Sequence, residues 1–158
     1  MATVYSDVRT DLTQDDPTEF VQANQLGGVL RVARGSYEAA SLSAGDVIEM
    51  FALPNGARIL SGKLCHDALG ASTTLAVGHA AYTNSAGTAV AADADEFKAA
   101  AASTSAQCVD IAATLALGSG TEVDLEGDTA NNEYIVTVTL AGAAATGTIE
   151  VTMFYVVD

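Results

Sequence analysis

The clearest pattern in the chain is an alternation of large apolar residues with polar or smaller ones in two runs, 133–140 and 148–157. A period of two places successive side chains on opposite faces of a β-strand, so each run is predicted to be a strand with one buried face. Seven small residues, AGAAATG, separate the runs. The two strands are therefore candidates to pair as a hairpin, with their threonine-rich faces towards solvent.

A second informative stretch, Ala44–Leu69, contains two predicted strands joined at Leu53-Pro54-Asn55-Gly56. Proline presets φ near −65° and Asn-Gly tolerates positive φ, so the chain can reverse or turn a corner there. The first of these strands is apolar on both faces. Such a strand is covered on both sides, by another layer of the chain or by another subunit.

The two apolar faces of this strand are predicted to have different roles. Other well-patterned strands have one polar face, which makes Ile48 and Met50 unusual. We expect Ile48 and Met50 to face another subunit, and Phe51 and Leu53 to lie in the core.

Four further segments complete a predicted set of eight strands, with one short helix from Asp93 or Asp95 to about Ala102. The helix is Ala-rich, and acidic residues at its N-terminus suit the helix dipole. Eight strands of this spacing predict an all-β fold, an eight-stranded jelly-roll-like β-sandwich with one short helix. An immunoglobulin-like sandwich is the alternative, but tryptophan is absent. The predicted strands are 29–39, 45–53, 58–69, 73–82, 106–117, 122–126, 133–140 and 148–157.

Residues 1–28 have weak periodicity, five acidic residues and a central proline. They are predicted to form an extended N-terminal arm, followed by a single β-sandwich domain over 29–158. Phe20, Val21 and Leu26 would anchor the arm on its own domain or on a neighbouring subunit. A tail ordered only near its end is the alternative.

Composition limits both the core and the partners. In a chain of 158 residues, apolar residues make up 49%, but aromatic residues only 6%. We therefore expect a thin core that oligomerisation helps to stabilise. Twenty acidic against six basic residues give a formal charge of −14. This charge argues against binding nucleic acid or an anionic membrane, because both need clustered Lys and Arg.

The chain has no apolar run long enough to span a membrane, and its first residues do not resemble a signal peptide. Synthesis in a reducing cytosol is then the expectation. Cys65 and Cys108 are predicted to be reduced, partly buried residues, since a bridge needs a proximity that the sequence does not reveal.

The sequence offers little catalytic chemistry, and we expect no enzyme activity, cofactor or metal. His66 and His79 are the only histidines, and a cupin-like metal site would need a His-x-His motif and a third histidine. Zinc held by these two with Cys65 and Cys108 has the right ligand count but no supporting spacing. The acidic segment 118–128 lacks the EF-hand spacing.

Four of the basic residues, Arg31, Arg34, Arg58 and Lys63, fall in predicted strands that are taken to be adjacent in the fold, 29–39 and 58–69. They could form a positive patch that meets an acidic neighbour, Arg31 and Arg34 in particular. Scattered surface ion pairs of small energy are the favoured alternative.

Several short motifs resemble the small structural proteins of tailed-bacteriophage virions, in particular those that decorate or cement the head. These motifs are Ala-Gly-Asp-Val at 44–47, Leu-Pro-Asn-Gly-Ala at 53–57, Asp-Ala-Leu-Gly at 67–70 and the closing Tyr-Val-Val-Asp at 155–158. The resemblance implies a homotrimer on the capsid exterior that stabilises contacts between subunits of the major capsid protein. It also implies a virion protein made and assembled in the host cytoplasm. A head-fibre or tail component, a carbohydrate- or receptor-binding jelly roll, and a cupin-like metalloenzyme are the alternatives.

Overall fold

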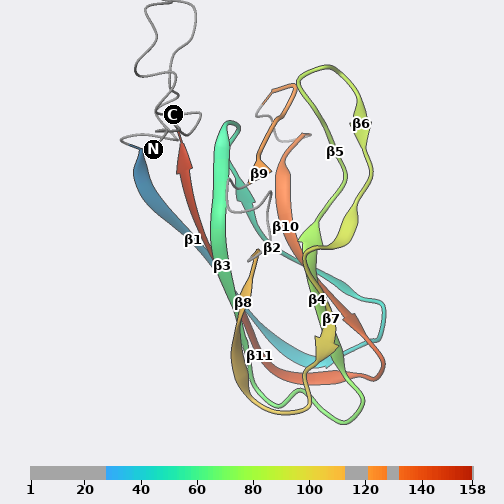
Figure 1. Ribbon diagram of the computed structural model, residues 1–158. Helices are drawn as coiled ribbons and strands as arrows, with labels where there is room; N and C mark the ends of the chain where they lie inside the picture. Colours follow the sequence, from blue (N-terminus) through green and yellow to red (C-terminus); the bar gives the residue numbers. More distant parts are fainter. Residues whose placement is uncertain (1–27, 113–120, 128–131, 158) are drawn as a thin grey trace, which may run out of the picture.

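The computed structural model describes residues 28–112, 121–127 and 132–157, and these form two antiparallel β-sheets packed face to face (Figure 1). The first sheet has the order β1 (Val29–Leu42), β11 (Ala145–Val157), β3 (Ala57–His66) and β8 (Gln107–Ile111), with β9 (Thr121–Glu122) also paired to β3. The second has the order β2 (Val47–Leu53), β10 (Tyr134–Ala141), β4 (Thr74–His79) and β7 (Asp93–Ala102). The short strands β5 (Tyr82–Thr83) and β6 (Ala89–Val90) pair with each other.

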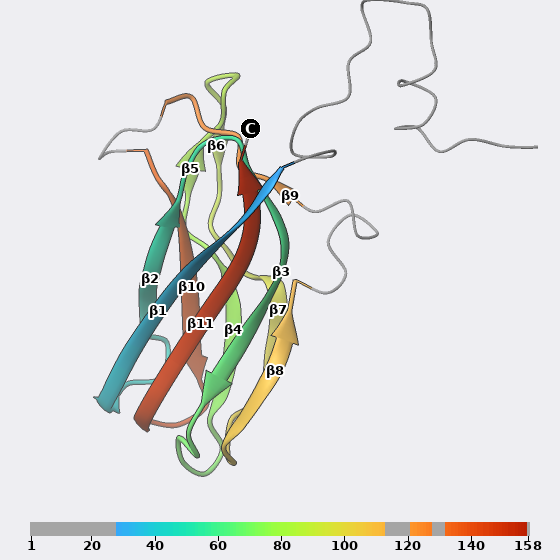
Figure 2. The same ribbon diagram turned by 90° about the vertical axis from the view of Figure 1, so that its left-hand side faces the viewer.

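The order of the strands follows a single rule. The first long strand pairs with the last, β1 with β11, and then β2 with β10, β3 with β8 and β4 with β7. The chain is thus one long hairpin folded over itself, so that successive pairs alternate between the sheets up to β4 and β7. Figure 2 shows β1, β11, β3 and β8 side by side in front of the second sheet.

The core lies between the two sheets and is made of the alternating residues that the sequence pattern predicts. Val136, Val138 and Leu140 of β10 are fully buried. They pack in one cluster with Val151 and Met153 of β11. The period-two alternation of these two strands therefore does reflect one buried face each.

The pairing expected for those two strands is wrong, because β10 and β11 lie in different sheets. Gly142 has a φ of 89°, and a Cβ there would lie 1.9 Å from the carbonyl oxygen of Ser72. The connection therefore crosses between the sheets with its backbone against another segment. One threonine expected in solvent, Thr137, is buried.

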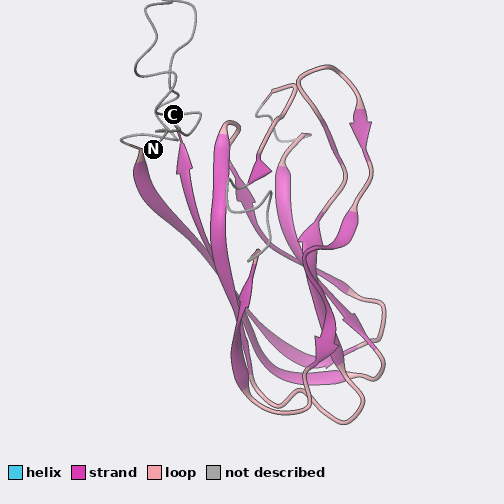
Figure 3. Cartoon of the chain, viewed as in Figure 1, coloured by secondary structure: helices cyan, strands magenta, loops and turns pink. Residues whose placement is uncertain are grey.

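The short helix expected near 93–102 is also wrong. This segment is strand β7, which pairs with β4, and the described residues contain no helix (Figure 3). Phe97 is buried in the core, while the alanines around it are mostly exposed. Pairing with β4 and burial of Phe97 outweigh the helix propensity of alanine, which is only a few tenths of a kcal/mol per residue. In the part of the chain that the structure describes, the eight strands of the prediction become eleven, three of them with two residues each.

The two strands predicted within Ala44–Leu69 do not pair with each other, since β2 and β3 lie in different sheets. The Pro54-Asn55-Gly56 turn therefore makes a corner between layers. Asn55 holds it, accepting from the backbone N–H of Leu125 at 2.9 Å and donating to the carbonyl of the same residue at 3.3 Å. Of the two options that the turn residues allow, the corner is the one used.

The expected faces of β2 are wrong in part, and the cause is a bulge. The pairing with β10 shifts register between Glu49 and Phe51, so that one residue of β2 has no direct partner. A bulge reverses the alternation beyond it. Ile48 and Leu53 therefore both face the core, although an odd number of positions separates them. Met50 is half-buried and packs against the same core.

Candidate interaction surface

An apolar patch covers one end of the first sheet, on the face that points away from the second. The register aligns Val32 of β1 with Phe154 of β11, and Leu60 of β3 lies at a register shift beside it. Val32 is 55% exposed and Leu60 37%. Isolated exposed apolar residues are common, but a contiguous group on neighbouring strands marks an interaction site.

The first residues of β1 enlarge this surface. Val29 is 70% exposed and Leu30 58%, and the side chains of these adjacent residues point to opposite faces. In Figure 1 this end of β1 diverges from the second sheet together with the end of β11. Both faces of the strand are thus uncovered there by the described residues. We name this surface the β1 patch: Val29, Leu30, Val32, Leu60 and Phe154.

The edge of β1 adds backbone groups to the patch. Within the described residues β1 pairs on one side only, with β11. Further along, at Gly35, a Cβ would lie 2.8 Å from the carbonyl oxygen of Met50, so the two sheets approach closely there. The open part of the edge is therefore its first half, before Gly35. A long apolar edge with unpaired N–H and C=O groups is a template for pairing with another chain.

Basic side chains flank the β1 patch and are largely held by acidic ones. Arg34 bonds Glu150 between β1 and β11, Arg58 lies 3.0 Å from Glu122, and Lys63 lies 2.7 Å from Asp110. Each pair joins neighbouring strands of the first sheet on its outer face. The ion-pair interpretation of these residues is therefore correct for three of the four.

The ion pairs shift the ionisation of their members in the expected directions. The hydrogen bond from Lys63, and then its charge, lower the pKa of the Asp110 carboxyl. The hydrogen bond from Arg34 likewise lowers the pKa of Glu150, and the reverse effect raises the pKa of Arg34. Lys63, Asp110 and Arg34 are solvent-exposed and Glu150 is half-buried at the surface, so the pairs contribute little to stability.

The predicted interface residues are distributed unevenly. Arg31 and Arg34 are exposed on β1, beside the β1 patch, and their role at an interface stays a prediction. Ile48 is 6% exposed in the core, so the expectation that it faces another subunit is wrong. Met50 is only half-buried, and its role at an interface stays a prediction. Phe20, Val21 and Leu26 lie outside the described residues.

The β1 patch itself was missed by the sequence interpretation. Its signal was present, because Val29 and Leu30 are adjacent and Val32 follows on the face of Leu30. Strand β1 is thus apolar on both faces at its start, the same property that the sequence shows in β2. In β2 the two apolar faces arise from a bulge, whereas in β1 the apolar side chains are exposed on both faces.

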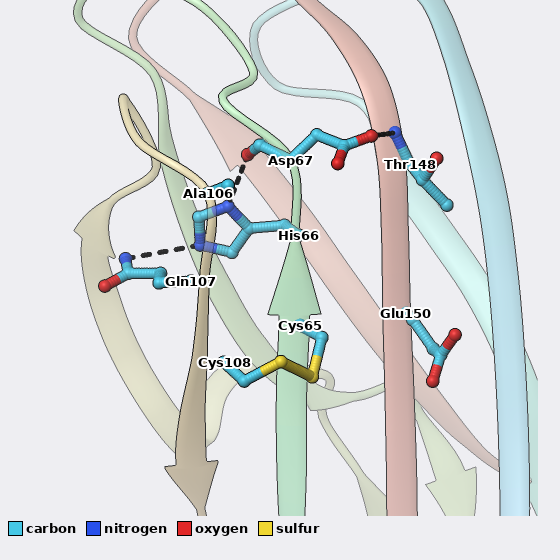
Figure 4. Close-up of a pocket in the computed structure, with 8 residues that line it drawn as sticks. All are labelled: Cys65, His66, Asp67, Ala106, Gln107, Cys108, Thr148 and Glu150. Carbon is cyan, nitrogen blue, oxygen red and sulfur yellow. Dashed lines mark hydrogen bonds between the residues drawn. A yellow bond between two sulfur atoms is a disulfide. The ribbon is translucent and has the colours of Figure 1, made fainter.

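A cavity of about 380 Å³ lies on the same outer face, where β3 ends and β8 begins (Figure 4). Cys65 and Cys108 line it, joined in a disulfide bond, so the expectation that they are reduced is wrong. They occupy directly paired positions of β3 and β8, which supplies the proximity that the sequence could not reveal. Asp67 on its rim accepts from the backbone N–H of Thr148 at 2.9 Å, and this bond lowers the pKa of Asp67.

The two histidines are buried structural residues that lie on different sheets. His66 Nδ1 donates to the carbonyl oxygen of Asp67 at 2.7 Å, and His79 Nδ1 donates to that of Ala80 at 2.8 Å. His79 also packs against the rings of Tyr82 and Tyr134, with centroids 5.4 and 5.1 Å away. Burial raises the pKa of Tyr134 and, to a smaller extent, of Tyr82.

The described residues hold no group of three or more His, Cys, Asp or Glu side chains placed to bind a metal. The zinc hypothesis fails on specific grounds, because the disulfide occupies both candidate thiolates and the histidines are on separate sheets. No helix in the described part of the chain is long and apolar enough to cross a membrane.

Comparison with known proteins finds likeness in structure. No protein-family model and no curated protein sequence matches the chain. A chain in the capsid of Ralstonia phage GP4 is 24% identical, with a TM-score of 0.60, over 83% of this chain and 86% of its own length. A chain in the capsid asymmetric unit of cyanophage Pam1 is 22% identical, with a TM-score of 0.53, over 92% of this chain and 99% of its own. The chain therefore shares its β-sandwich fold with a chain of each of these two phage capsids.

Proposed function

We propose that this protein is a non-enzymatic structural protein of a tailed-phage virion, a decoration protein that binds the outer surface of the head. The observation that carries the proposal is the extent of the structural likeness. The match to the cyanophage capsid chain covers 92% of this chain and 99% of the other, so it leaves little of either chain unmatched. The motifs at 44–47, 53–57 and 67–70 support the same proposal.

The topology supports a jelly roll as the specific form of the sandwich. A jelly roll is an eight-stranded double sheet built from two Greek keys. Without the two-residue strands, the sheets here have the orders β1-β11-β3-β8 and β2-β10-β4-β7. A long hairpin folded over itself produces this order, and the connections between sheets follow from it.

The β1 patch supports binding to a protein shell. Val29, Leu30 and Val32 combine exposed apolar area with an open strand edge, and Arg31 adds a positive charge beside them. A protein partner can bury the apolar area and complete the hydrogen bonds of the edge. We assign this surface to the major capsid protein.

The charge supports the exterior of the head. A net charge of −14 opposes contact with packaged DNA and keeps the free protein soluble before assembly. The protein is then a virion component that contacts the major capsid protein and, as a homotrimer, other copies of itself. The acidic arm, residues 1–28, would contact a neighbouring copy.

A co-sedimentation assay with phage heads assembled without this protein tests the proposal. Wild-type protein is expected to sediment with the heads and to raise their melting temperature. Val32→Asp on the β1 patch is expected to weaken binding at least tenfold, because burial of a charge at an apolar contact is costly.

Val47→Asp is the matched control, because Val47 is 57% exposed but lies on β2 of the other sheet. It should bind as the wild type does, and circular dichroism should show both variants folded. Absence of wild-type binding would overturn the decoration role, and equal loss in both variants would overturn the assignment of the β1 patch. Light scattering measures the oligomeric state of the purified protein. A monomer at all concentrations would exclude the trimer.

A further inference from the structure

The disulfide between Cys65 and Cys108 joins the central strand β3 of the first sheet to its edge strand β8, on the outer face. The two residues are directly paired across β3 and β8, with Cα atoms 4.0 Å apart. This short separation is typical of the non-hydrogen-bonded pairs of an antiparallel ladder, in which side chains come closest. The bond therefore fastens the edge strand β8 directly to its neighbour β3.

Small molecules in solution can reach this bond. Cys108 is exposed, and within the described residues β8 has β3 as its only neighbour in the sheet. The cavity of about 380 Å³ is lined by both cysteines together with His66, Gln107 and Glu150 (Figure 4). Most buried structural disulfides lack such an opening, and access is one of the determinants of exchange rate.

The surroundings distinguish the two sulfur atoms. Cys65 is half-buried in the central strand β3, and its register partner on β11 is Glu150. An attacking thiolate must approach along the S–S axis, opposite to the leaving sulfur. For Cys65 this path leads towards the neighbouring strand β11 and past Glu150, whose carboxylate is already paired with Arg34, so the strand hinders the approach. For Cys108 the path leads in from the open edge of the sheet.

We propose that the Cys65–Cys108 bond is a site of reversible exchange with small thiols of the glutathione class, entered at Cys108. The thiolate bonds to Cys108 Sγ, the S–S bond breaks, and Cys65 leaves as a thiolate that takes up a proton. A second small thiol then releases Cys108 as a thiol and leaves as the symmetrical disulfide. Two protein thiols are formed and two small thiols are oxidised, and the small disulfide drives the reverse reaction.

Exchange at this site would control how firmly β8 is held. Without the bond, β8 keeps the five-residue register with β3, the buried side chain of Ile111 and the ion pair from Lys63 to Asp110. The backbone N–H of Ala112 also bonds the carbonyl oxygen of Phe97 at 2.8 Å. The edge therefore loosens and the sandwich stays folded, so the bond works as a clamp set by the surrounding thiol concentration.

The first test measures the rate of reduction by glutathione of the full-length oxidised protein, at urea concentrations below the unfolding transition. Exchange in the native state predicts a rate independent of urea. A rate that rises with urea in step with the global unfolding equilibrium would overturn the proposal, because the bond would then be reached only by unfolding. Hydrogen exchange at 107–111 is expected to accelerate at least tenfold after reduction, and unchanged protection there would contradict the clamp.

The second test locates the trapped mixed disulfide by peptide mapping after acid quenching. The glutathione adduct is expected on Cys108 in at least nine of ten molecules, and a majority on Cys65 would overturn the assignment. Glu150→Gln removes this carboxylate and releases the guanidinium of Arg34, so it is expected to raise the share on Cys65 several-fold. Glu122→Gln is the matched control, because Glu122 pairs with Arg58 as Glu150 pairs with Arg34 but does not line the cavity, and it should leave the ratio unchanged.

Discussion

The two edges of the first sheet, β1 and β8, are built in opposite ways. Strand β1 has fourteen residues, apolar exposed side chains and an open first half. Strand β8 has five residues and is held to β3 by a disulfide and by the ion pair from Lys63 to Asp110. Short length and charge are the usual means by which proteins blunt an edge. The contrast indicates that β8 is protected from pairing while β1 is left available for it.

Removing the disulfide is expected to have the largest effect on this comparison. Cys65→Ser with Cys108→Ser frees a loop with a sequence separation of 43, and loop-closure entropy for that length corresponds to about 4 kcal/mol of stability. For a chain of this size the melting temperature should fall by about 10 °C. Urea and thermal unfolding followed by circular dichroism measure it. Wild-type protein under a reductant should show the same loss, and a change below about 1 kcal/mol would mean that the bond does not hold this edge.

Truncating one anchor residue on each edge should give the next largest contrast. Ile111 of β8 is 1% exposed, so Ile111→Ala is expected to cost about 3 kcal/mol through lost burial and a cavity. Val29→Ala on β1 removes an exposed side chain and should change stability by less than about 0.5 kcal/mol. Urea unfolding of both variants makes the comparison. Similar losses would show that the start of β1 is covered in the folded protein.

Blunting β1 is expected to change association and leave stability nearly constant. Val32→Lys places a charge on the β1 patch, a device that natural edge strands use against pairing. Its unfolding free energy should stay within about 0.5 kcal/mol of the wild type. Sedimentation velocity should show weaker binding to the capsid partner, with Val47→Lys as the control on the other sheet. Full binding by Val32→Lys would remove β1 from the interface.

The ion pair on β8 should give the smallest effect, visible mainly in its titration. Because Lys63 lowers the pKa of Asp110 in the folded protein, the pair contributes stability above the unfolded pKa of Asp, about 3.9. That contribution disappears as the pH falls through the lower folded value. Lys63→Gln should return the Asp110 pKa towards its ordinary range, as followed by carboxyl NMR. Arg34→Gln should do the same for Glu150 on the β1 side. An unchanged Asp110 titration would show that the pair does not form in solution.

The sequence pattern predicts the class of the fold and most of its long strands, because period-two burial is a local property. It predicts β10 and β11 well, yet pairs them with each other, because pairing depends on contacts that a local pattern does not contain. The helix expected at 93–102 fails for the same reason, since the partner strand β4 decides the conformation.

Two finer errors concern the faces of strands and the candidate site. A single extra residue at the bulge in β2 turns Ile48 inwards, and no local signal announces the bulge. Cys65 and Cys108 meet only because β3 and β8 pair in one register, in which a one-residue slip would put them on opposite faces. In contrast, the exposed start of β1 could have been predicted from Val29, Leu30 and Val32, by the same test of two apolar faces that was applied to β2.

The pairing of the first long strand with the last has a consequence for biosynthesis. Strand β1 is the first of the described strands to be synthesised, whereas its hydrogen-bonding partner β11 is the last of them. A nascent chain cannot complete this ladder until β11 has been translated, and contacts so distant in sequence form slowly. Chains that stop before β11 consequently lack the strand platform on which the β1 patch is displayed. Truncation before β11 therefore removes the surface proposed to bind the capsid.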